Sequence, residues 1–371
     1  MIPVWEPVLD GNEERYVLDC LETNWISSLG EYIRRFEELF AMYCGVPHGV
    51  ACSSCTTGLH MAMVALGIGP GDEVIIPDFT LIVSANTVIQ AGARPVLVDA
   101  DPRTWCIDPA RIEERITPRT KAIMAVHMYG HPCDMPAIVE IARKRNLLVI
   151  EDCAEAHGAE IAGRKVGSFG DVACFSFYGN KILTTGEGGM ILCSDGELAK
   201  KLRVLRDQGF EHPRFVHRVM GFNYRLTNVQ AAIGLAQTEK VTEKVEKKRE
   251  IAAWYDEAFA NNPDVGLPIE APGAKNVYWM YGIKLGDRYT QGRDAVMVQL
   301  KEKGVDTRAF FCPMHMQPVF QDASDPRLPD RSGSFPVSED LWKRGLYLPS
   351  GLGITRSQAQ EVAARVLECR P

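Results

Sequence analysis

The chain has 371 residues, of which 46% are hydrophobic and 24% charged, and its 41 basic and 48 acidic residues give a formal charge of −7. This composition is that of a globular protein, and the length predicts two domains. The acidic balance argues against a nucleic-acid partner, which would require a basic surface. No signal-peptide pattern opens the chain, and no apolar run approaches the length of a membrane span. We therefore expect a cytoplasmic protein with no membrane partner.

The cysteines raise the question of a metal or redox site. Their number, 11, is odd, and they lack regular spacing. Cys52 and Cys55 have the C-x-x-C spacing of a redox or zinc pair, but no second pair follows at a finger-like distance. In a cytosolic protein such residues are expected to be reduced thiols. We predict no metal site, and a zinc or thiol-redox protein stays open as an alternative.

Short apolar runs alternate with amphipathic segments through the first 225 residues. The length and β-branched content of these runs predict buried strands at residues 73–76, 95–98, 122–126, 147–150, 172–177 and 189–192. The segments between them predict helices at residues 57–66, 81–91 and 135–145. This order predicts an α/β domain with a mainly parallel sheet.

The pattern changes after residue 225. A long helix is predicted from 228 to 261, first small and apolar and then highly charged. A strand at 278–283 and a helix at 293–303 follow among proline-rich turns. We interpret this region as a second, smaller α+β domain, and divide the chain into a large domain at 1–249 and a small C-terminal domain at 250–371.

Three features fall just after predicted strands, where functional residues of open α/β sheets gather. Asp152 ends one strand and could pair with a cationic ring nitrogen, although an aspartate there could equally cap a helix. Lys181 follows another strand and lies before a glycine-rich turn; a lysine that loses its proton can form a covalent bond with a carbonyl cofactor. Residues 53–58 precede a helix and could hold a phosphate through amides and hydroxyls, or simply cap that helix.

Motifs spread along the whole chain carry a family resemblance. They read WISSLGEYIRRFE, GDEVIIPDFT, HMYGHPCDM, EDCAEAHGA, FSFYGNKILTTGEGGM, GFNYRLTNVQAAIGLAQ and TRAFFCPMHMQPVF. The chain resembles the fold-type I pyridoxal-phosphate aminotransferases, and among them the DegT/DnrJ/EryC1/StrS family of nucleotide-sugar aminotransferases. The resemblance implies pyridoxal 5′-phosphate as cofactor, with pyridoxamine phosphate as its aminated form.

The resemblance also implies roles for individual residues. Lys181 would bind the cofactor covalently, Asp152 would pair with its ring nitrogen, and Glu155 would lie near its 3-hydroxyl group, where many relatives have Gln. The remaining cofactor contacts implied are with the phosphate, from Thr56, Thr57, Ser176 and, in the neighbouring subunit, Asn223. The chain would then form a homodimer with its active site at the interface.

Arg308 and His315 match the segment of the family that faces the substrate, where two cations could meet a diphosphate or a carboxylate. Two departures from the family pattern concern the cofactor ring and the substrate side. Leu81 replaces an aromatic residue that commonly packs on the ring, so that packing would be aliphatic or Phe79 would substitute, and Cys312 replaces a common Tyr. His157 either packs near the ring or is a satisfied histidine at the start of a helix.

The implied reaction is the transfer of an amino group from L-glutamate to a nucleotide-linked 4-keto-6-deoxy sugar, with GDP-4-keto-6-deoxy-D-mannose as the preferred acceptor. Other keto sugars aminated at C3 or C4 and cyclitol ketones stay open. A sugar 3-dehydratase is a rival within the family, but that chemistry goes with histidine at the position of Lys181. A cofactor-binding regulatory protein without turnover is a rival from another class.

Overall fold

The computed structural model describes residues 1–213, 215–322, 324–331 and 333–370. Its centre is a seven-stranded sheet with the order β1-β9-β8-β5-β4-β2-β3, in which β9 runs antiparallel to β1 and β8 and the other neighbouring pairs are parallel. The strands are β1 (His48–Cys52), β2 (Glu73–Pro77), β3 (Arg94–Val98), β4 (Thr120–Val126), β5 (Leu148–Asp152), β8 (Val172–Ser176) and β9 (Gly189–Cys193). The predicted α/β fold with a mainly parallel, mixed sheet is confirmed.

The helices of this first part are α1 (Glu13–Glu22), α2 (Glu31–Cys44), α3 (Cys55–Ala65), α4 (Val83–Gln90), α5 (Met135–Arg145), α6 (Gly196–Arg206) and α7 (Asn228–Glu239). Apolar residues at helical spacing explain their packing, as in α2, which buries Ile33, Phe36 and Phe40. Short 3₁₀ turns are η1 (Pro109–Arg111), η2 (Glu113–Arg115), η3 (Met128–Gly130), η4 (Met314–Met316) and η5 (Pro318–Phe320). No helix within the described ranges combines the length and apolar character needed to cross a bilayer.

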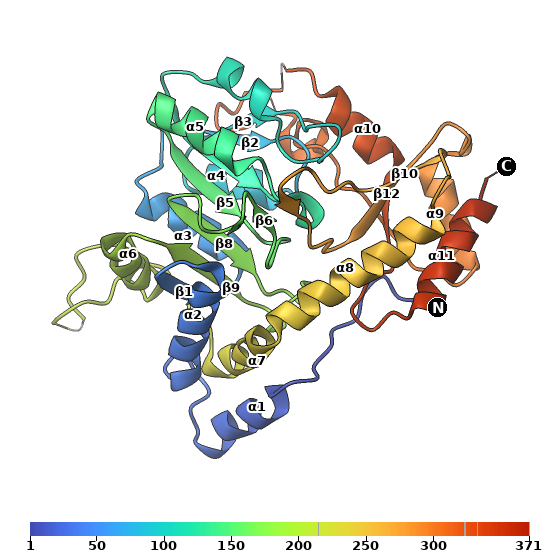
Figure 1. Cartoon of the computed structure of the whole chain (residues 1–371). Coiled ribbons are helices and arrows are strands. Elements are labelled where there is room, and N and C mark those ends of the chain that lie inside the picture. Colours follow the sequence, from blue (N-terminus) through green and yellow to red (C-terminus); the bar gives the residue numbers. More distant parts are fainter. Residues whose placement is uncertain (214, 323, 332, 371) are drawn as a thin grey trace.

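The single helix predicted from 228 to 261 is two helices, α7 and α8 (Val241–Ala258). Lys240 separates them with a φ of −109° and a ψ of 12°, which are not helical. The break allows α7 to pack against α2, while α8 runs across the molecule to α11 (Arg356–Glu368), beside which the N-terminus lies (Figure 1).

The C-terminal part is built on a four-stranded antiparallel sheet with the order β10-β12-β14-β13. Its strands are β10 (Val265–Gly266), β12 (Tyr281–Leu285), β13 (Arg308–Ala309) and β14 (Gly345–Leu348), and its helices besides α11 are α9 (Gly292–Glu302) and α10 (Pro336–Arg344). A small sheet of β11 (Ala274–Lys275), β6 (Glu160–Ile161) and β7 (Arg164–Lys165) joins the two parts.

Two hydrophobic clusters meet on α8. Val245 belongs to the cluster around the seven-stranded sheet, whereas Ile251 and Tyr255 belong to a cluster with Tyr281 and Val362. Helix α8 therefore packs on the first cluster near Val245 and on the second cluster from Ile251 onward. We retain the division into domains at 1–249 and 250–371 as a proposal.

Candidate active site

A pocket of about 280 Å³ lies beyond the carboxyl ends of β5 and β8. Five of the predicted residues line it: Thr56, Asp152, Glu155, Ser176 and Lys181. Parallel strands end at the same edge of a sheet, so Asp152 and Ser176, the last residues of β5 and β8, come together there. The polar residues that follow separate strands in the sequence thus share one cavity.

Asp152 is not a helix cap. Its Oδ1 accepts a hydrogen bond from the amide of Ala154 at 3.1 Å, and the chain after it forms turns instead of a helix. Burial raises the pKa of the Asp152 carboxyl, against opposing effects of the Ala154 amide and the Lys181 charge. The carboxylate is therefore best stabilised by a cation within the pocket.

Lys181 is buried, and its amide donates to the carbonyl of Tyr178 at 2.9 Å. Its Nζ atom lies 3.7 Å from the centre of a ring of Trp279. Burial lowers the pKa of the Lys181 amine, while Glu155 and Asp152 oppose that effect. A lysine whose pKa is lowered provides the neutral amine that covalent chemistry with a carbonyl requires.

Glu155 is the second carboxyl group of the pocket. Its Oε2 atom accepts a hydrogen bond from the amide of Tyr129 at 2.8 Å. Burial raises the pKa of Glu155 to about 7, although Lys181 and the Tyr129 amide favour the charged form. A carboxyl group with this pKa can gain and lose a proton near neutral pH.

The N-terminus of α3 forms another wall of the pocket. Ser54 caps the helix, because its side chain accepts from the amide of Thr57 at 3.2 Å while the Thr57 hydroxyl accepts from the Ser54 amide at 3.1 Å. Thr56 and Ser176 line the pocket, whereas Thr57 serves the cap behind it. First-turn amides and the helix dipole make this wall suitable for a phosphate.

Three other predicted residues lie outside this pocket. Asn223 is exposed and forms a backbone bridge with Asp207. Arg308 is exposed and bonds to Asp306 at 2.5 Å, and the Nδ1 atom of His315 lies 2.8 Å from Asp78 Oδ2.

Two expectations were wrong: that Phe79 could take the place of Leu81 against the cofactor ring, and that His157 could be a satisfied histidine at the start of a helix. Phe79 is fully buried against Tyr129 and Phe310, so it does not substitute for Leu81, which itself lines the pocket. His157 lies in a turn and not at the start of a helix, and its ring nitrogens have no hydrogen-bond partner among the described residues.

The structure adds aromatic residues that the sequence did not reveal. Trp279, Phe311 and Tyr347 line the pocket although they lie far from Lys181 in the chain. The aromatic run Tyr278–Tyr281 was visible in the sequence, but its strand pattern did not indicate which ring reaches the site.

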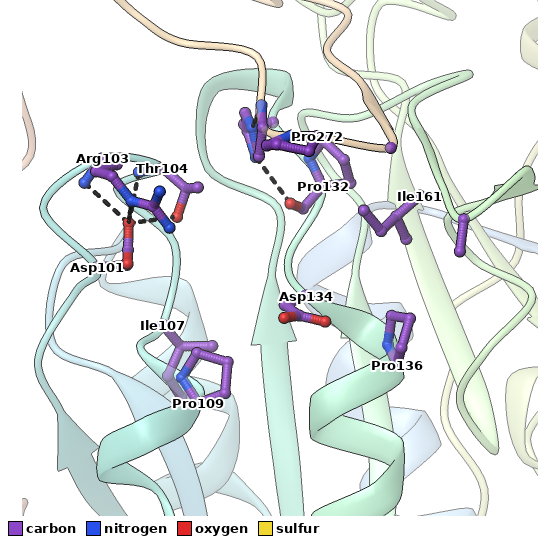
Figure 2. Close-up of a pocket in the computed structure, with 14 residues that line it drawn as sticks. Asp101, Arg103, Thr104, Ile107, Pro109, Pro132, Asp134, Pro136, Ile161 and Pro272 are labelled. Carbon is purple, nitrogen blue, oxygen red and sulfur yellow. Dashed lines mark hydrogen bonds and ion pairs between the residues drawn. The ribbon is translucent and has the colours of Figure 1, made fainter.

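A second hollow, of about 350 Å³, lies between the 101–109 and 131–136 segments and the 271–273 turn (Figure 2). Its carboxylates already have partners in local turns. Asp101 accepts from the amides of Arg103 and Thr104 at 2.9 and 2.8 Å, and Asp134 caps α5 through the amide of Ala137. These two carboxylates therefore stabilise the loops around the hollow.

His127, Glu151 and Cys153 lie close enough together to be considered as metal ligands. However, His127 Nδ1 accepts from the amide of Cys133 at 3.0 Å, and its Nε2 lies 3.3 Å from Glu151 Oε2. Both ring nitrogens are therefore occupied, and Glu151 also accepts from the amides of Gly167, Phe169 and Gly170. These contacts favour a structural hydrogen-bond network.

The fold and the pocket define an α/β enzyme of the kind that holds a carbonyl cofactor on a lysine. The model of the DegT/DnrJ/EryC1/StrS aminotransferase family matches residues 7–367, and the chain belongs to this family. It is thus a pyridoxal-phosphate-dependent aminotransferase.

Named relatives agree with this assignment. The chain is 50% identical to a GDP-perosamine synthase of Caulobacter vibrioides, over 98% of this chain and 96% of the relative. It is 43% identical to a GDP-perosamine synthase of Escherichia coli O157:H7, over 99% and 98%. The crystal structure of DesV of S. venezuelae in complex with a ketimine intermediate superposes with a TM-score of 0.89 at 36% identity, covering 96% of this chain and 94% of that one.

The residues of the pocket fit the cofactor that the family implies. An amine, a carboxylate and a helix N-terminus face one cavity, as an aldehyde, a ring nitrogen and a phosphate require. The Asn180 Oδ1 atom is buried beside Lys181 and has no hydrogen-bond partner among the described residues. Because buried acceptors are rarely left unpaired, this atom also indicates that a ligand with donor groups belongs in the pocket.

Proposed function

We propose that this chain transfers an amino group from L-glutamate to C4 of GDP-4-keto-6-deoxy-D-mannose and so forms GDP-perosamine. The observation that carries the proposal is the convergence of Lys181, Asp152 and the α3 N-terminus on one pocket. The choice of sugar is supported by the GDP-perosamine synthases that are 50% and 43% identical to this chain over nearly its whole length.

The two principal residues would have distinct roles. Lys181 would hold the cofactor covalently and, once released, carry a proton between the substrate and the cofactor, acting as base and then as acid. Asp152 would keep the ring nitrogen protonated by a charge-assisted hydrogen bond. Pyridoxal phosphate, when bound, supplies the electron-accepting ring that stabilises the charge left on the amino donor.

The other residues predicted to bind the cofactor would contact its phosphate and its 3-hydroxyl group. Thr56 and Ser176 would contact the phosphate together with the α3 amides, and Thr57 would support them by capping the helix. Glu155 would lie near the 3-hydroxyl group of the ring. Asn223 would contact the phosphate of the cofactor bound in the neighbouring subunit, so that each active site of a homodimer contains residues of both chains.

Arg308 and His315 would face the nucleotide sugar or glutamate. Burial lowers the pKa of His315, but Asp78 and Glu339 outweigh it, so the net direction is upward and the cationic ring is favoured. An exposed guanidinium and a cationic imidazole suit a diphosphate or a carboxylate.

The experiment uses protein that has been loaded with pyridoxamine phosphate and freed of donor. It is mixed separately with GDP-4-keto-6-deoxymannose, with keto sugars on other nucleotides, with 3-keto sugars and with a cyclitol ketone, and the products are identified by mass spectrometry. Preferred amination of the GDP-linked 4-keto sugar supports the proposal. Preference for another acceptor would overturn the choice of sugar, and formation of a 3-deoxy sugar would indicate the dehydratase.

A further inference from the structure

Lys181 is in direct contact with an aromatic side chain from a distant part of the chain. Its Nζ atom lies 3.7 Å from the centre of a Trp279 ring, and Trp279 is only 3% exposed. A lysine ammonium within about 6 Å of an indole face is attracted by the ring quadrupole, and the attraction is larger where water is excluded. The contact is therefore energetically significant in this pocket.

The orientation of the indole is determined from two sides. Its Nε1 donates a hydrogen bond to the carbonyl of Asn180 at 2.7 Å, which ties the ring to the residue that precedes Lys181. It also stacks on Tyr129, with ring centres 6.2 Å apart and an interplanar angle of 20°. An indole held in this way cannot rotate without breaking one of the two contacts.

Tyr129 contacts both the Trp279 indole and Glu155, the carboxyl group whose charged form Lys181 favours. Its amide donates to Glu155 Oε2 at 2.8 Å, while its ring supports Trp279. The turn that allows both contacts is left-handed, with φ of 51° at Tyr129 and 99° at Gly130. A Cβ atom at Gly130 would lie 2.7 Å from the Trp279 amide nitrogen, so only glycine permits the approach.

We propose that Trp279 is a positioning residue for Lys181, whose amine rests on the indole face that the Tyr129 turn and the Asn180 carbonyl hold in place. The inference rests on the proposed role of Lys181 and extends it to a residue outside the sheet that carries the lysine. Lys181 must return to one place whenever its amine is free, since a base that moves a proton has to stay within hydrogen-bond reach of it. The indole face provides that place.

The contact predicts a measurable change in acidity. An indole favours the ammonium form, so its removal should lower the pKa of Lys181 further than burial already does. Trp279→Leu removes both the ring face and the Nε1 donor, whereas Trp279→Phe keeps a weaker face without the donor. We expect the pKa of Lys181 to fall by about one unit in Trp279→Leu and by less in Trp279→Phe.

The test is competitive labelling of amines in cofactor-free protein over a range of pH, with the Lys181 peptide quantified by mass spectrometry. Exposed Lys200 on α6 serves as an internal reference that should not change. Circular dichroism and urea unfolding establish that each variant is folded. An unchanged Lys181 labelling profile in folded Trp279→Leu protein would overturn the proposal.

A second measurement separates this proposal from the proposed function. Borohydride reduction of the cofactor-loaded protein, followed by peptide mapping, should attach the cofactor to Lys181 in the wild type and in both variants. The variants should then show a lower rate for the half-reaction with L-glutamate at saturation, with the larger loss in Trp279→Leu. Attachment to a different residue in the wild type would refute the role of Lys181, whereas normal attachment with an unchanged rate would refute only the role of Trp279.

Discussion

The Oε2 atom of Glu155 accepts a hydrogen bond from the backbone amide of Tyr129 at 2.8 Å, inside the pocket that holds Lys181. The bond stabilises the charged form of a carboxyl group whose burial favours the neutral form. Because burial prevails, the group is poised between the two forms near neutral pH. The protonation of Glu155 therefore affects the stability of the folded chain and makes that stability depend on pH.

Glu155→Gln should change how stability depends on pH in the cofactor-free protein. The pKa of Glu155 is about 7 in the folded state, above the 4.5 of an unperturbed glutamate, so the wild type loses stability as pH rises from about 4 to about 7. Glutamine removes this loss, and the variant should gain on the order of 2 kcal/mol relative to wild type over that range. Urea unfolding at pH 5 and pH 8 measures the difference. Glu140→Gln, at an exposed glutamate whose pKa is lowered by Lys144, is the control and should show no such gain. If the difference in free energy of unfolding between Glu155→Gln and the wild type is the same at pH 5 and pH 8, the prediction is wrong.

Lys181→Ala should abolish transamination, with turnover falling by ~10⁴-fold or more, because it removes both the covalent attachment and the group that moves the proton. Borohydride treatment should no longer fix the cofactor to the protein, since no bond between Lys181 and the cofactor remains to be reduced, and mass spectrometry of the intact chain checks this. Lys200→Ala, at an exposed lysine of α6, is the matched control and should retain wild-type turnover. Full activity in Lys181→Ala would refute the assignment.

Subunit mixing should reveal whether Asn223 acts in the neighbouring site. Lys181→Ala and Asn223→Ala proteins should each be nearly inactive, the first through lost chemistry and the second through weakened cofactor binding. If the site is shared, a hybrid dimer has one site with both changes and one with neither, so random mixing should restore about a quarter of wild-type activity. Assays at limiting cofactor before and after exchange of subunits provide the measurement. No recovery despite verified hybrids would place Asn223 in the site of its own chain.

His157→Leu should stabilise the protein most at low pH. His157 packs against Phe40, Phe175 and Phe177, and burial and the Lys181 charge lower its pKa to about 3, against a smaller opposing effect of the Ser176 backbone. The unfolded chain thus binds a proton that the folded chain does not, and the wild type loses stability as pH falls below about 6.5. Leucine also removes two unpaired ring nitrogens. Thermal unfolding should show a larger gain at pH 5 than at pH 8; an equal gain at both would contradict the pKa argument.

Gly130→Ala should be more damaging than the same substitution at another glycine with a positive φ. Gly130 and Gly163 have φ of 99° and 75°, but a Cβ atom at Gly130 meets the Trp279 amide at 2.7 Å while one at Gly163 meets nothing within 4 Å. Gly163→Ala should therefore cost about 1 kcal/mol, the price of the left-handed backbone alone. Gly130→Ala should cost at least about 2 kcal/mol and also slow the half-reaction with glutamate. Equal losses of stability in urea unfolding would show that the close contact at Gly130 has no effect.

Much of the large domain was predictable because strand length, turn residues and helical spacing are local properties. Five predicted residues, Thr56, Asp152, Glu155, Ser176 and Lys181, converge on one pocket, since parallel strands carry their carboxyl ends to one edge. The helix break at Lys240 was missed, because it depends on how α7 and α8 pack and no proline or glycine marks it.

The sequence by itself determined that a carboxylate and a lysine follow separate strands and that a phosphate-binding turn precedes a helix, because strands, turns and helix starts are encoded locally. Strands that run in the same direction end at one edge of the sheet, which brings these groups together. Only the tertiary structure decided what surrounds the Lys181 amine. Trp279 comes from the segment before β12, about 100 residues away, and its indole is held by Asn180 and Tyr129. Contacts between distant segments depend on how the two hydrophobic clusters pack, and no local pattern in the chain encodes that packing.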